Sequence, residues 1–391
     1  MPASLAKGAQ SVACGQLVSL FSISSLIMAK YLLLRDVSTP AFLNCCFYVA
    51  LSLIGLSYSF RQQGRLLNEQ LSAAAQPATP LESPVVTSVS VGTFPAMDED
   101  LETAAPAQQQ KPQQPPYEPR WWSYPIVAFF DLQANCLAIR SLEFTDYASV
   151  GLILNLTIPF VLLLSCITFR HKYSWRHIAG CAIAAVGGLV LFLGSFWRDQ
   201  TGENSQQLYG CFVALTAALM YGASNIANQL YLRVQGVDRA IESLGMIGAW
   251  GAGLAILQMI ILERVEVIAI VWTAEVAICF TSYVLVMLSF YLLVSVLPRP
   301  TTASPVYNLS ILVSNLYLAF ASCYLFAESP HLFFFAALAL ILSGLTVHCI
   351  EHSRARKERE EQSKKVRVSF GSMRTPTDLK LVAIQIEQAA L

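Results

Sequence analysis

The apolar run between Trp121 and Ile139 carries a carboxylate and an amide one helical turn apart. Asp131 and Asn135 lie four residues apart, so in a helix they are neighbours on one face. A lone carboxylate in an apolar helix is costly to bury and usually serves a function. It can bind a cationic group, exchange a proton or pair with a base, for which Lys30 in another apolar run is a candidate. Because Lys30 lies near the end of its run, its ammonium can instead reach the aqueous boundary.

Polar residues also recur at helical spacing in two other apolar runs. They are Tyr221, Asn225 and Asn228 in one run and Asn308 and Asn315 in the other. In each run the residues share one face of a helix. Such stripes either join packed helices by hydrogen bonds or line a cavity. Because three runs carry them, we predict that these residues line one small-molecule cavity with Asp131 and Asn135. Tyr283 and Tyr317 are candidates for its aromatic walls.

The residue clusters that enzymes and metal centres need are not found in the sequence. The ten cysteines lie in apolar stretches without CxxC spacing, and His348 and His352 have no third ligand beside them. Neither a phosphate-binding glycine loop nor a nucleophile motif occurs. We therefore predict no enzymatic activity, no metal and no cofactor. Basic and acidic residues number 25 each, which argues against a nucleic-acid partner.

The elements that hold these residues are expected to cross a lipid bilayer. Of the 391 residues, 55% are hydrophobic and 13% are charged, whereas soluble proteins carry about 25% charged residues. Ten apolar runs reach the length of about 20 residues that a spanning helix needs. They are 12–34, 41–60, 121–139, 148–169, 178–196, 208–232, 243–262, 276–297, 303–326 and 332–350. Backbone polar groups find no water in hydrocarbon, so each run must be helical.

The remaining segments are a linker and a tail. Residues 61–120 are rich in Ala, Pro and Gln, so we predict a disordered cytosolic linker there. The predicted organisation is spans 1–2 in residues 1–60, the linker in 61–120, spans 3–5 in 121–200, spans 6–10 in 201–350, and a cytosolic tail in 351–391. With ten spans, twenty Lys and Arg residues lie on the same side of the membrane as the termini, whereas four arginines lie on the other side. This asymmetry places both termini in the cytosol. The membrane of residence can be either the plasma membrane or an endomembrane.

A short internal similarity divides the spans into two sets of five. Thr145-Asp-Tyr-Ala148-Ser149 precedes Gly188-Leu189, and Thr301-Thr-Ala303-Ser304 precedes Gly344-Leu345 at nearly the same separation. Because five is odd, the second set enters the membrane from the opposite side, and similar halves become inverted repeats. The expected fold class is therefore an all-α membrane protein with ten transmembrane helices in two inverted five-helix repeats.

Small residues and one proline predict details of the packing. Gly180, Ala184 and Gly188 recur every four residues, as do Ala249 and Gly253, which predicts close helix contacts on those faces. Pro159 is expected to kink the helix that spans residues 148–169.

Several motifs together resemble one known family. They are Gly15-Gln-Leu-Val-Ser-Leu, Ala29-Lys30-Tyr31-Leu, Trp121-Trp122, Asp131-Leu-Gln-Ala-Asn135, Tyr221-Gly-Ala-Ser-Asn225, Glu242-Ser-Leu-Gly-Met-Ile-Gly, Asn308-Leu-Ser310 and Asn315-Leu-Tyr317. Over residues 8–350, outside the linker, the chain resembles the F branch of solute carrier family 35, in the drug/metabolite transporter superfamily. The resemblance implies ten helices in two inverted halves, cytosolic termini and no ATPase. Where related proteins carry acidic residues, this chain has Gln133, Asn228, Gln229 and Asn315, so proton coupling through those positions is not expected to carry over.

Two functions are compatible with these features. The resemblance implies a secondary transporter that moves a nucleotide sugar, a nucleobase-like compound or a related metabolite by alternating access. Its partners would be a small-molecule solute and the lipid bilayer, with a homodimer as one assembly. The alternative is a multi-pass membrane scaffold or receptor that transports nothing and uses its cytosolic linker and tail to bind partners.

Overall fold

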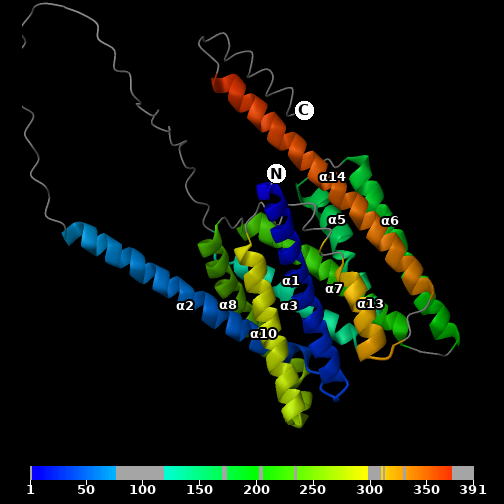
Figure 1. The fold of residues 1–391 in the computed structure, drawn as a ribbon. Coiled ribbons are helices and arrows are strands. Elements are labelled where there is room, and N and C mark those ends of the chain that lie inside the picture. The colour runs from blue at the N-terminus through cyan, green and yellow to red at the C-terminus, as the bar shows by residue number, and fades with distance from the viewer. Residues whose placement is uncertain are drawn as a thin grey trace, which may run out of the picture.

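The computed structural model describes residues 2–75, 119–169, 174–201, 206–232, 236–297, 310, 313–328 and 332–371. Every extended regular element in these ranges is a helix (Figure 1). The helices are α1 (Pro2–Leu33), α2 (Pro40–Ala75), α3 (Ser123–Ser141), α4 (Tyr147–Leu154), α5 (Thr157–Phe169), α6 (Trp175–Thr201), α7 (Gln207–Ala227), the π-helix η1 (Asn228–Leu232), α8 (Val237–Leu262), α9 (Arg264–Ala269), α10 (Ala274–Val296), α13 (Ser314–Leu325) and α14 (Leu332–Gly371). The predicted all-α class is therefore confirmed over the part of the chain that the structure describes.

Eight stretches in the described ranges are long and apolar enough to cross a membrane. They are Ala9–Leu33, Pro40–Ser72, Tyr147–Phe169, Trp175–Trp197, Gln207–Leu232, Val237–Leu262, Ala274–Val296 and Leu332–Glu351. Each overlaps one of the ten predicted runs. The predicted third run forms α3, a helix of 19 residues that includes Asp131 and Asn135 and is not among the eight. The ninth run is only partly described, so the count of ten spans stays a prediction.

The span at residues 147–169 is interrupted near its middle. α4 ends at Leu154 and α5 begins at Thr157, with a turn at Asn155 and Leu156 between them. Pro159 has no N–H group to bond the carbonyl of Asn155, four residues earlier, and its ring crowds that carbonyl. The break therefore falls where a proline at position 159 should place it, and the predicted kink is confirmed.

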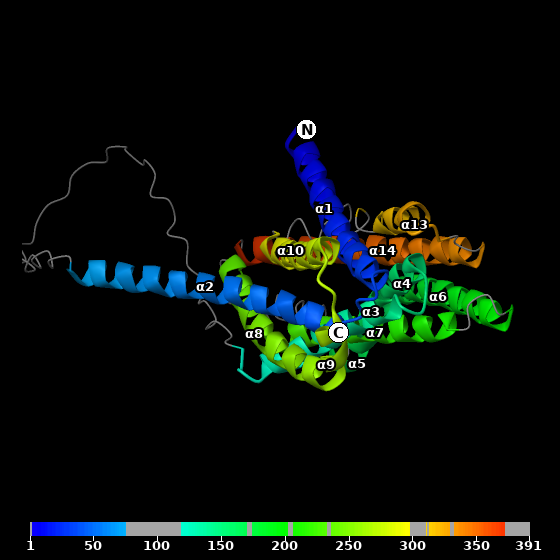
Figure 2. The same ribbon diagram turned by 90° about the horizontal axis from the view of Figure 1, so that it is seen from below.

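Two helices continue beyond the predicted ends of their spans. α2 runs to Ala75 and α14 runs to Gly371, whereas the predicted boundaries are residues 60 and 350. The far part of α2 projects away from the other helices in both views (Figures 1 and 2). Gln, Arg, Leu and Glu dominate residues 61–71, and these residue types favour a helix without tertiary support. The predicted disordered linker is therefore wrong for residues 61–75, and residues 76–118 lie outside the described ranges.

Helices from the earlier and later parts of the chain lie against one another in pairs. The most extensive contacts join α6 to α14, α2 to α8, α3 to α7 and α1 to α10. Figures 1 and 2 both place the α2–α8 pair at one side of the bundle and the α6–α14 pair at the other. The helices that carry the predicted polar residues, α3 and α7, are thus direct neighbours near the middle.

Glycines allow two of these pairs to approach at backbone distance. A Cβ atom on Gly55 of α2 would lie 2.3 Å from the Cα atom of Gly245 on α8. A Cβ atom on Gly344 of α14 would lie 2.5 Å from the backbone oxygen of Gly180 and 2.6 Å from the nitrogen of Ala184 on α6. Such close contact lets dispersion forces stabilise helix pairs in a bilayer. The predicted packing role of Gly180 and Ala184 is confirmed.

The contact face of α8 differs from the predicted one. Ala249 is exposed, and a Cβ atom on Gly253 would meet nothing within 4 Å. The glycines of α8 that face α2 are instead Gly245, Gly248 and Gly251. The predicted packing role of Ala249 and Gly253 is therefore wrong, because two small residues at helical spacing mark a face without saying which face meets a neighbour.

Candidate functional site

A cavity of about 440 Å³ lies between α1, α3, α7, α8 and α10. Its wall contains five of the seven residues predicted to line a binding site. They are Asp131 and Asn135 on α3, Tyr221 and Asn225 on α7, and Asn228 at the start of η1. The helical spacing that groups these residues in the sequence therefore corresponds to two facing helices in the fold, because α3 and α7 pack directly against each other.

Asp131 is held by two phenol groups from other helices. The hydroxyl of Tyr48 on α2 donates to Oδ2 of Asp131 at 2.7 Å, and the hydroxyl of Tyr291 on α10 donates to the same oxygen at 2.8 Å. Hydrogen bonds to a carboxylate are shorter and stronger than bonds between neutral groups. The two phenols therefore fix the position of Asp131 in the cavity wall and compensate part of the cost of removing it from water.

Asn135 extends this cluster by one helical turn. Its Oδ1 atom accepts a hydrogen bond from the Tyr221 hydroxyl at 2.7 Å. Its Nδ2 atom lies within hydrogen-bonding distance of the hydroxyls of Tyr48 (3.1 Å) and Tyr291 (3.2 Å). The phenols that donate to Asp131 can thus accept from Asn135, and such chains of hydrogen bonds strengthen one another in a medium of low dielectric constant.

The rest of the cavity wall is mostly apolar and aromatic. Tyr283, Met287 and Phe290 on α10 and Leu244 and Ile247 on α8 contribute to it. Among the described lining residues, Asp131 is the only Asp or Glu, and none is Lys, Arg or His. An apolar pocket with a few convergent polar groups is the usual form of a small-molecule site. Its single carboxylate gives it a negative character.

Three residues of this region were not identified from the sequence. Tyr48 and Tyr291 bind Asp131, and Asn44 accepts a hydrogen bond from the predicted wall residue Tyr283 at 3.1 Å. Asn44 lies one helical turn before Tyr48 in an apolar run. That spacing could have indicated a polar face on this helix. A tyrosine in an apolar helix, however, more often serves only as a hydrophobic residue with a polar end.

Two of the candidate residues, Asn315 and Tyr317, are described and do not line the cavity. Asn315 is buried on α13, where its Oδ1 atom accepts a hydrogen bond from Asn155 at 2.7 Å. Tyr317 donates to Oε1 of Gln16 on α1 at 2.7 Å. Asn308 lies outside the described residues, so its place in the cavity stays a prediction.

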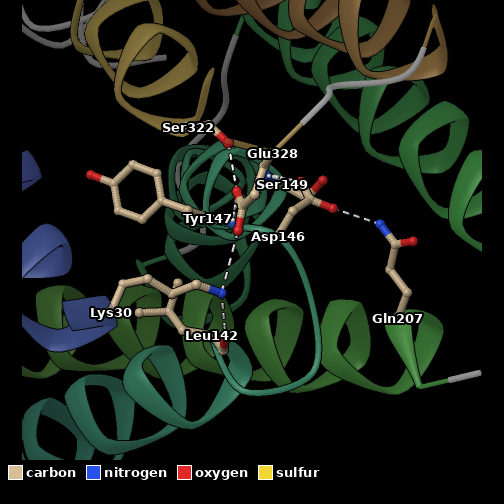
Figure 3. Close-up of polar contacts among 8 residues, drawn as sticks. All are labelled: Lys30, Leu142, Asp146, Tyr147, Ser149, Gln207, Ser322 and Glu328. Carbon is tan, nitrogen blue, oxygen red and sulfur yellow. Dashed lines mark hydrogen bonds and ion pairs between the residues drawn. The ribbon is translucent and has the colours of Figure 1, made fainter. Parts of the chain in front are cut away.

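Lys30 has partners other than Asp131. Its Nζ atom lies 3.4 Å from Oε1 of Glu328 and donates to the backbone oxygen of Leu142 at 3.0 Å (Figure 3). Asp131 is bound by Tyr48 and Tyr291 instead. The candidate charge pair between Lys30 and Asp131 is therefore not formed in this structure, and Lys30 is engaged at one end of the helix bundle.

Comparisons with known proteins agree on one family. The family described as "SLC35F: Solute carrier family 35" matches residues 117–350. Solute carrier family 35 member F2 of Xenopus tropicalis is 28% identical over 235 residues, which cover 59% of this chain and 59% of that protein. Member F2 of Mus musculus is 27% identical over 236 residues, covering 60% of this chain and 62% of that protein. The matched regions thus span about three fifths of the length of these relatives.

A fungal relative gives a similar result. A protein of Schizosaccharomyces pombe named as an uncharacterized solute carrier family 35 member is 27% identical over 229 residues. The match covers 58% of this chain and 44% of that protein. The family match begins at residue 117 and includes α3, α7, α8 and α10, which supply most of the cavity wall.

Proposed function

Because the chain belongs to solute carrier family 35, F branch, we propose that this multi-pass membrane protein is a secondary transporter of a small organic solute. The observation that carries the proposal is the cavity between α1, α3, α7, α8 and α10, where Asp131 and Asn135 are presented beside aromatic side chains. Polar groups on separate helices near the middle of a helix bundle are the usual arrangement of a transporter's substrate site. Asp131, Asn135, Tyr221, Asn225 and Asn228 are the residues we assign to solute binding.

The chemistry of the wall favours a nucleobase-like solute over a nucleotide sugar. Phosphate groups are usually bound by Arg or Lys side chains, and none occurs among the described lining residues. Asp131 would repel a diphosphate. A planar nitrogenous ring that is neutral or cationic could donate N–H groups to Asp131 and Asn225 while its faces lie against Phe290 and Tyr283.

The pairing of the helices supports an alternating-access mechanism between two inverted halves. If each span corresponds to the span five places later, α1 matches α7 and α3 matches α10. The α3–α7 contact then corresponds to the α10–α1 contact. By the same rule α2 matches α8 and α6 matches α14, so each of these two contacts joins a helix to its own counterpart. All four of the most extensive contacts therefore obey one twofold relation. Two halves related in this way can rock about a site at their interface.

Transport assays with cavity variants test the proposal. Metabolites would first be compared in cells with and without the protein, and the compound that changes most would be used for direct uptake measurements. Asp131→Asn and Asn225→Ala are each expected to lower the uptake rate about tenfold or more, because each removes a polar contact worth about 1.5 kcal/mol or more to a solute. Asp238→Asn is the control, since Asp238 is exposed at the start of α8 and outside the cavity. Parental uptake in both cavity variants, at equal membrane levels, would contradict this site assignment.

A deletion separates the transporter from the scaffold or receptor. α2 is helical to Ala75, so the deletion should begin after that residue and remove 76–116. A transporter is expected to keep its uptake rate, because none of the described cavity residues lies in the deleted segment. A protein that only binds partners through its linker would lose its cellular effect in the same variant.

A further inference from the structure

The ion pair between Lys30 and Glu328 lies directly beyond one end of the cavity. The last cavity residue on α1 is Leu26, one helical turn before Lys30. The last cavity residue on α3 is Ile139, three residues before Leu142, whose carbonyl accepts from Lys30. The side chains of Lys30 and Glu328 are only 14% and 20% exposed. The pair therefore occupies the place where the cavity would otherwise continue along α1 and α3.

Glu328 connects three separate parts of the chain. Besides the contact with Lys30, its Oε2 atom accepts hydrogen bonds from the Tyr147 backbone N–H at 2.9 Å and from the Ser322 hydroxyl at 2.6 Å (Figure 3). The Glu328 carboxylate thus contacts the start of α4, the end of α13 and the end of α1. The residue before it, Ala327, has a φ of 51°, a left-handed conformation that costs free energy in a non-glycine residue. The contacts of Glu328, the next residue, help to offset that cost.

A second polar contact joins α7 to the same end of the bundle. Asp146 accepts a hydrogen bond from the Ser149 N–H at 3.0 Å, which caps α4, and another from Nε2 of Gln207 at 2.6 Å (Figure 3). Gln207 is the first residue of α7. One polar layer therefore connects α1, α4, α7 and α13 at this end.

The cavity extends towards the opposite end of the bundle. On α10 its wall reaches Ser295, one residue before the helix ends at Val296, and directly after α7 it reaches Asn228, at the start of η1. α8 contributes Leu244 and Ile247 from its first half. By the distribution of basic residues, these helix ends lie on the side of the termini, which is the cytosolic side. The Lys30–Glu328 pair lies on the other side.

We propose that Lys30 and Glu328 form a gate that closes the non-cytosolic end of the cavity and must separate before a solute can pass that end. The pair is shielded enough to hold helices together, because attraction between charges increases as water is excluded. Both side chains nevertheless remain partly exposed, so water can solvate them once they part. The proposal rests on the proposed transport function, and it adds the residues that control access from one side.

Cysteine accessibility tests the gate without a known solute. Ser25 lines the cavity below the gate, and Ser25→Cys provides a reporter for a membrane-impermeant maleimide applied to sealed vesicles from the face opposite the termini. The parent protein without this reporter measures labelling of native cysteines such as Cys323, which is exposed. Lys30→Ala and Glu328→Gln are each expected to raise the reporter's labelling rate about tenfold or more, which corresponds to a bias of about 1.4 kcal/mol towards the open state. Glu328→Gln retains side-chain oxygen and so can keep an acceptor for Tyr147 or Ser322.

A conservative substitution and an exposed ion pair provide the controls. Lys30→Arg keeps a cation opposite Glu328 and a donor for the Leu142 carbonyl, so it is expected to label at the parental rate. Arg35→Ala breaks the Arg35–Glu275 pair at the same end, whose side chains are 58% and 62% exposed, and should leave the rate unchanged. Unchanged labelling in both single variants, an equal rise in Arg35→Ala, or a Lys30→Arg variant that labels as fast as Lys30→Ala would each overturn the proposal.

The accessibility result is independent of the transport result. Labelling requires neither a solute nor turnover, so a faster rate in Lys30→Ala would support the gate even if Asp131→Asn left uptake unchanged. Conversely, Asp131→Asn could abolish uptake while the gate variants label at the parental rate. The first outcome would contradict only the assigned solute site, and the second only the gate.

Discussion

Nδ2 of Asn155 donates a hydrogen bond to Oδ1 of Asn315 at 2.7 Å. Asn155 lies in the turn between α4 and α5, and Asn315 lies on α13, which packs against α4. The contact therefore joins the interrupted span to a helix 160 residues later in the chain. Asn315 acts here as a contact between helices, which was one of the two interpretations that its position in a polar stripe allowed.

Replacing Asn315 should affect stability more than transport. Asn315→Ala leaves the Asn155 amide without this acceptor, and we expect a loss of about 1 kcal/mol in the free energy of unfolding. Asn225→Ala should affect transport more than stability, because Asn225 faces the cavity. Thermal unfolding in detergent and solute uptake, measured side by side, would check both. A stable Asn315→Ala variant with abolished uptake would contradict the helix-contact role.

The contact of α2 with α8 should not tolerate a side chain at Gly245. A Cβ atom there would lie 2.8 Å from the backbone carbonyl carbon of Gly55. Gly245→Val is therefore expected to separate the helices and lower stability by about 2 kcal/mol or more. Gly253→Val is the matched control on the same helix, because a Cβ atom at that position meets nothing within 4 Å. Thermal unfolding of purified protein would distinguish the two, and equal stability would contradict the observed packing.

The two phenols that bind Asp131 should contribute jointly to transport. Tyr291→Phe and Tyr48→Phe each remove one hydrogen bond to the carboxylate. Because a bond to a charged group contributes about 1.5–3 kcal/mol, each variant is expected to lower the uptake rate about tenfold or more. A double-mutant cycle would measure their coupling, and strictly additive effects would indicate that the two phenols act separately.

The pH dependence of stability should change when Glu263 is replaced. Its two carboxylate oxygens accept hydrogen bonds from the backbone N–H groups of Ala41 and Phe42, at 2.8 and 3.0 Å, at the start of α2. Burial raises the pKa of the Glu263 carboxyl above its ordinary value of 4.5, although the two backbone hydrogen bonds oppose the shift. The folded state therefore keeps the proton to a higher pH than the unfolded state does.

The sign of this effect follows from proton linkage. The contribution of Glu263 to stability is fully present below pH 4.5 and is lost as the pH rises through the raised pKa. Glu263→Gln is expected to remove this part of the decline in the unfolding temperature as the pH rises above 4.5. Glu69→Gln, an exposed residue on the projecting part of α2, should retain the parental dependence. A parental pH profile in Glu263→Gln would contradict the shift.

Much of the cavity could be predicted from the sequence because local spacing determines the face of a helix. Asp131 and Asn135 are four residues apart, and Tyr221 and Asn225 are also four apart, so each pair lies on one side of its helix in any fold. Both faces contribute to the same cavity. The apolar runs likewise predicted the helices, because a bilayer leaves no other partner for the backbone polar groups.

The partners of these faces could not be predicted, because side chains on different helices meet only after packing. Lys30 and Asp131 looked like a plausible pair from charge alone, yet Lys30 contacts Glu328 and Asp131 contacts two phenols. Asn225 and Asn315 have the same side chain, and one lines the cavity while the other joins two helices. The sequence by itself determined which residues share a helix face. The tertiary structure decided which faces oppose one another, since that depends on close backbone approach at positions such as Gly55 and Gly245.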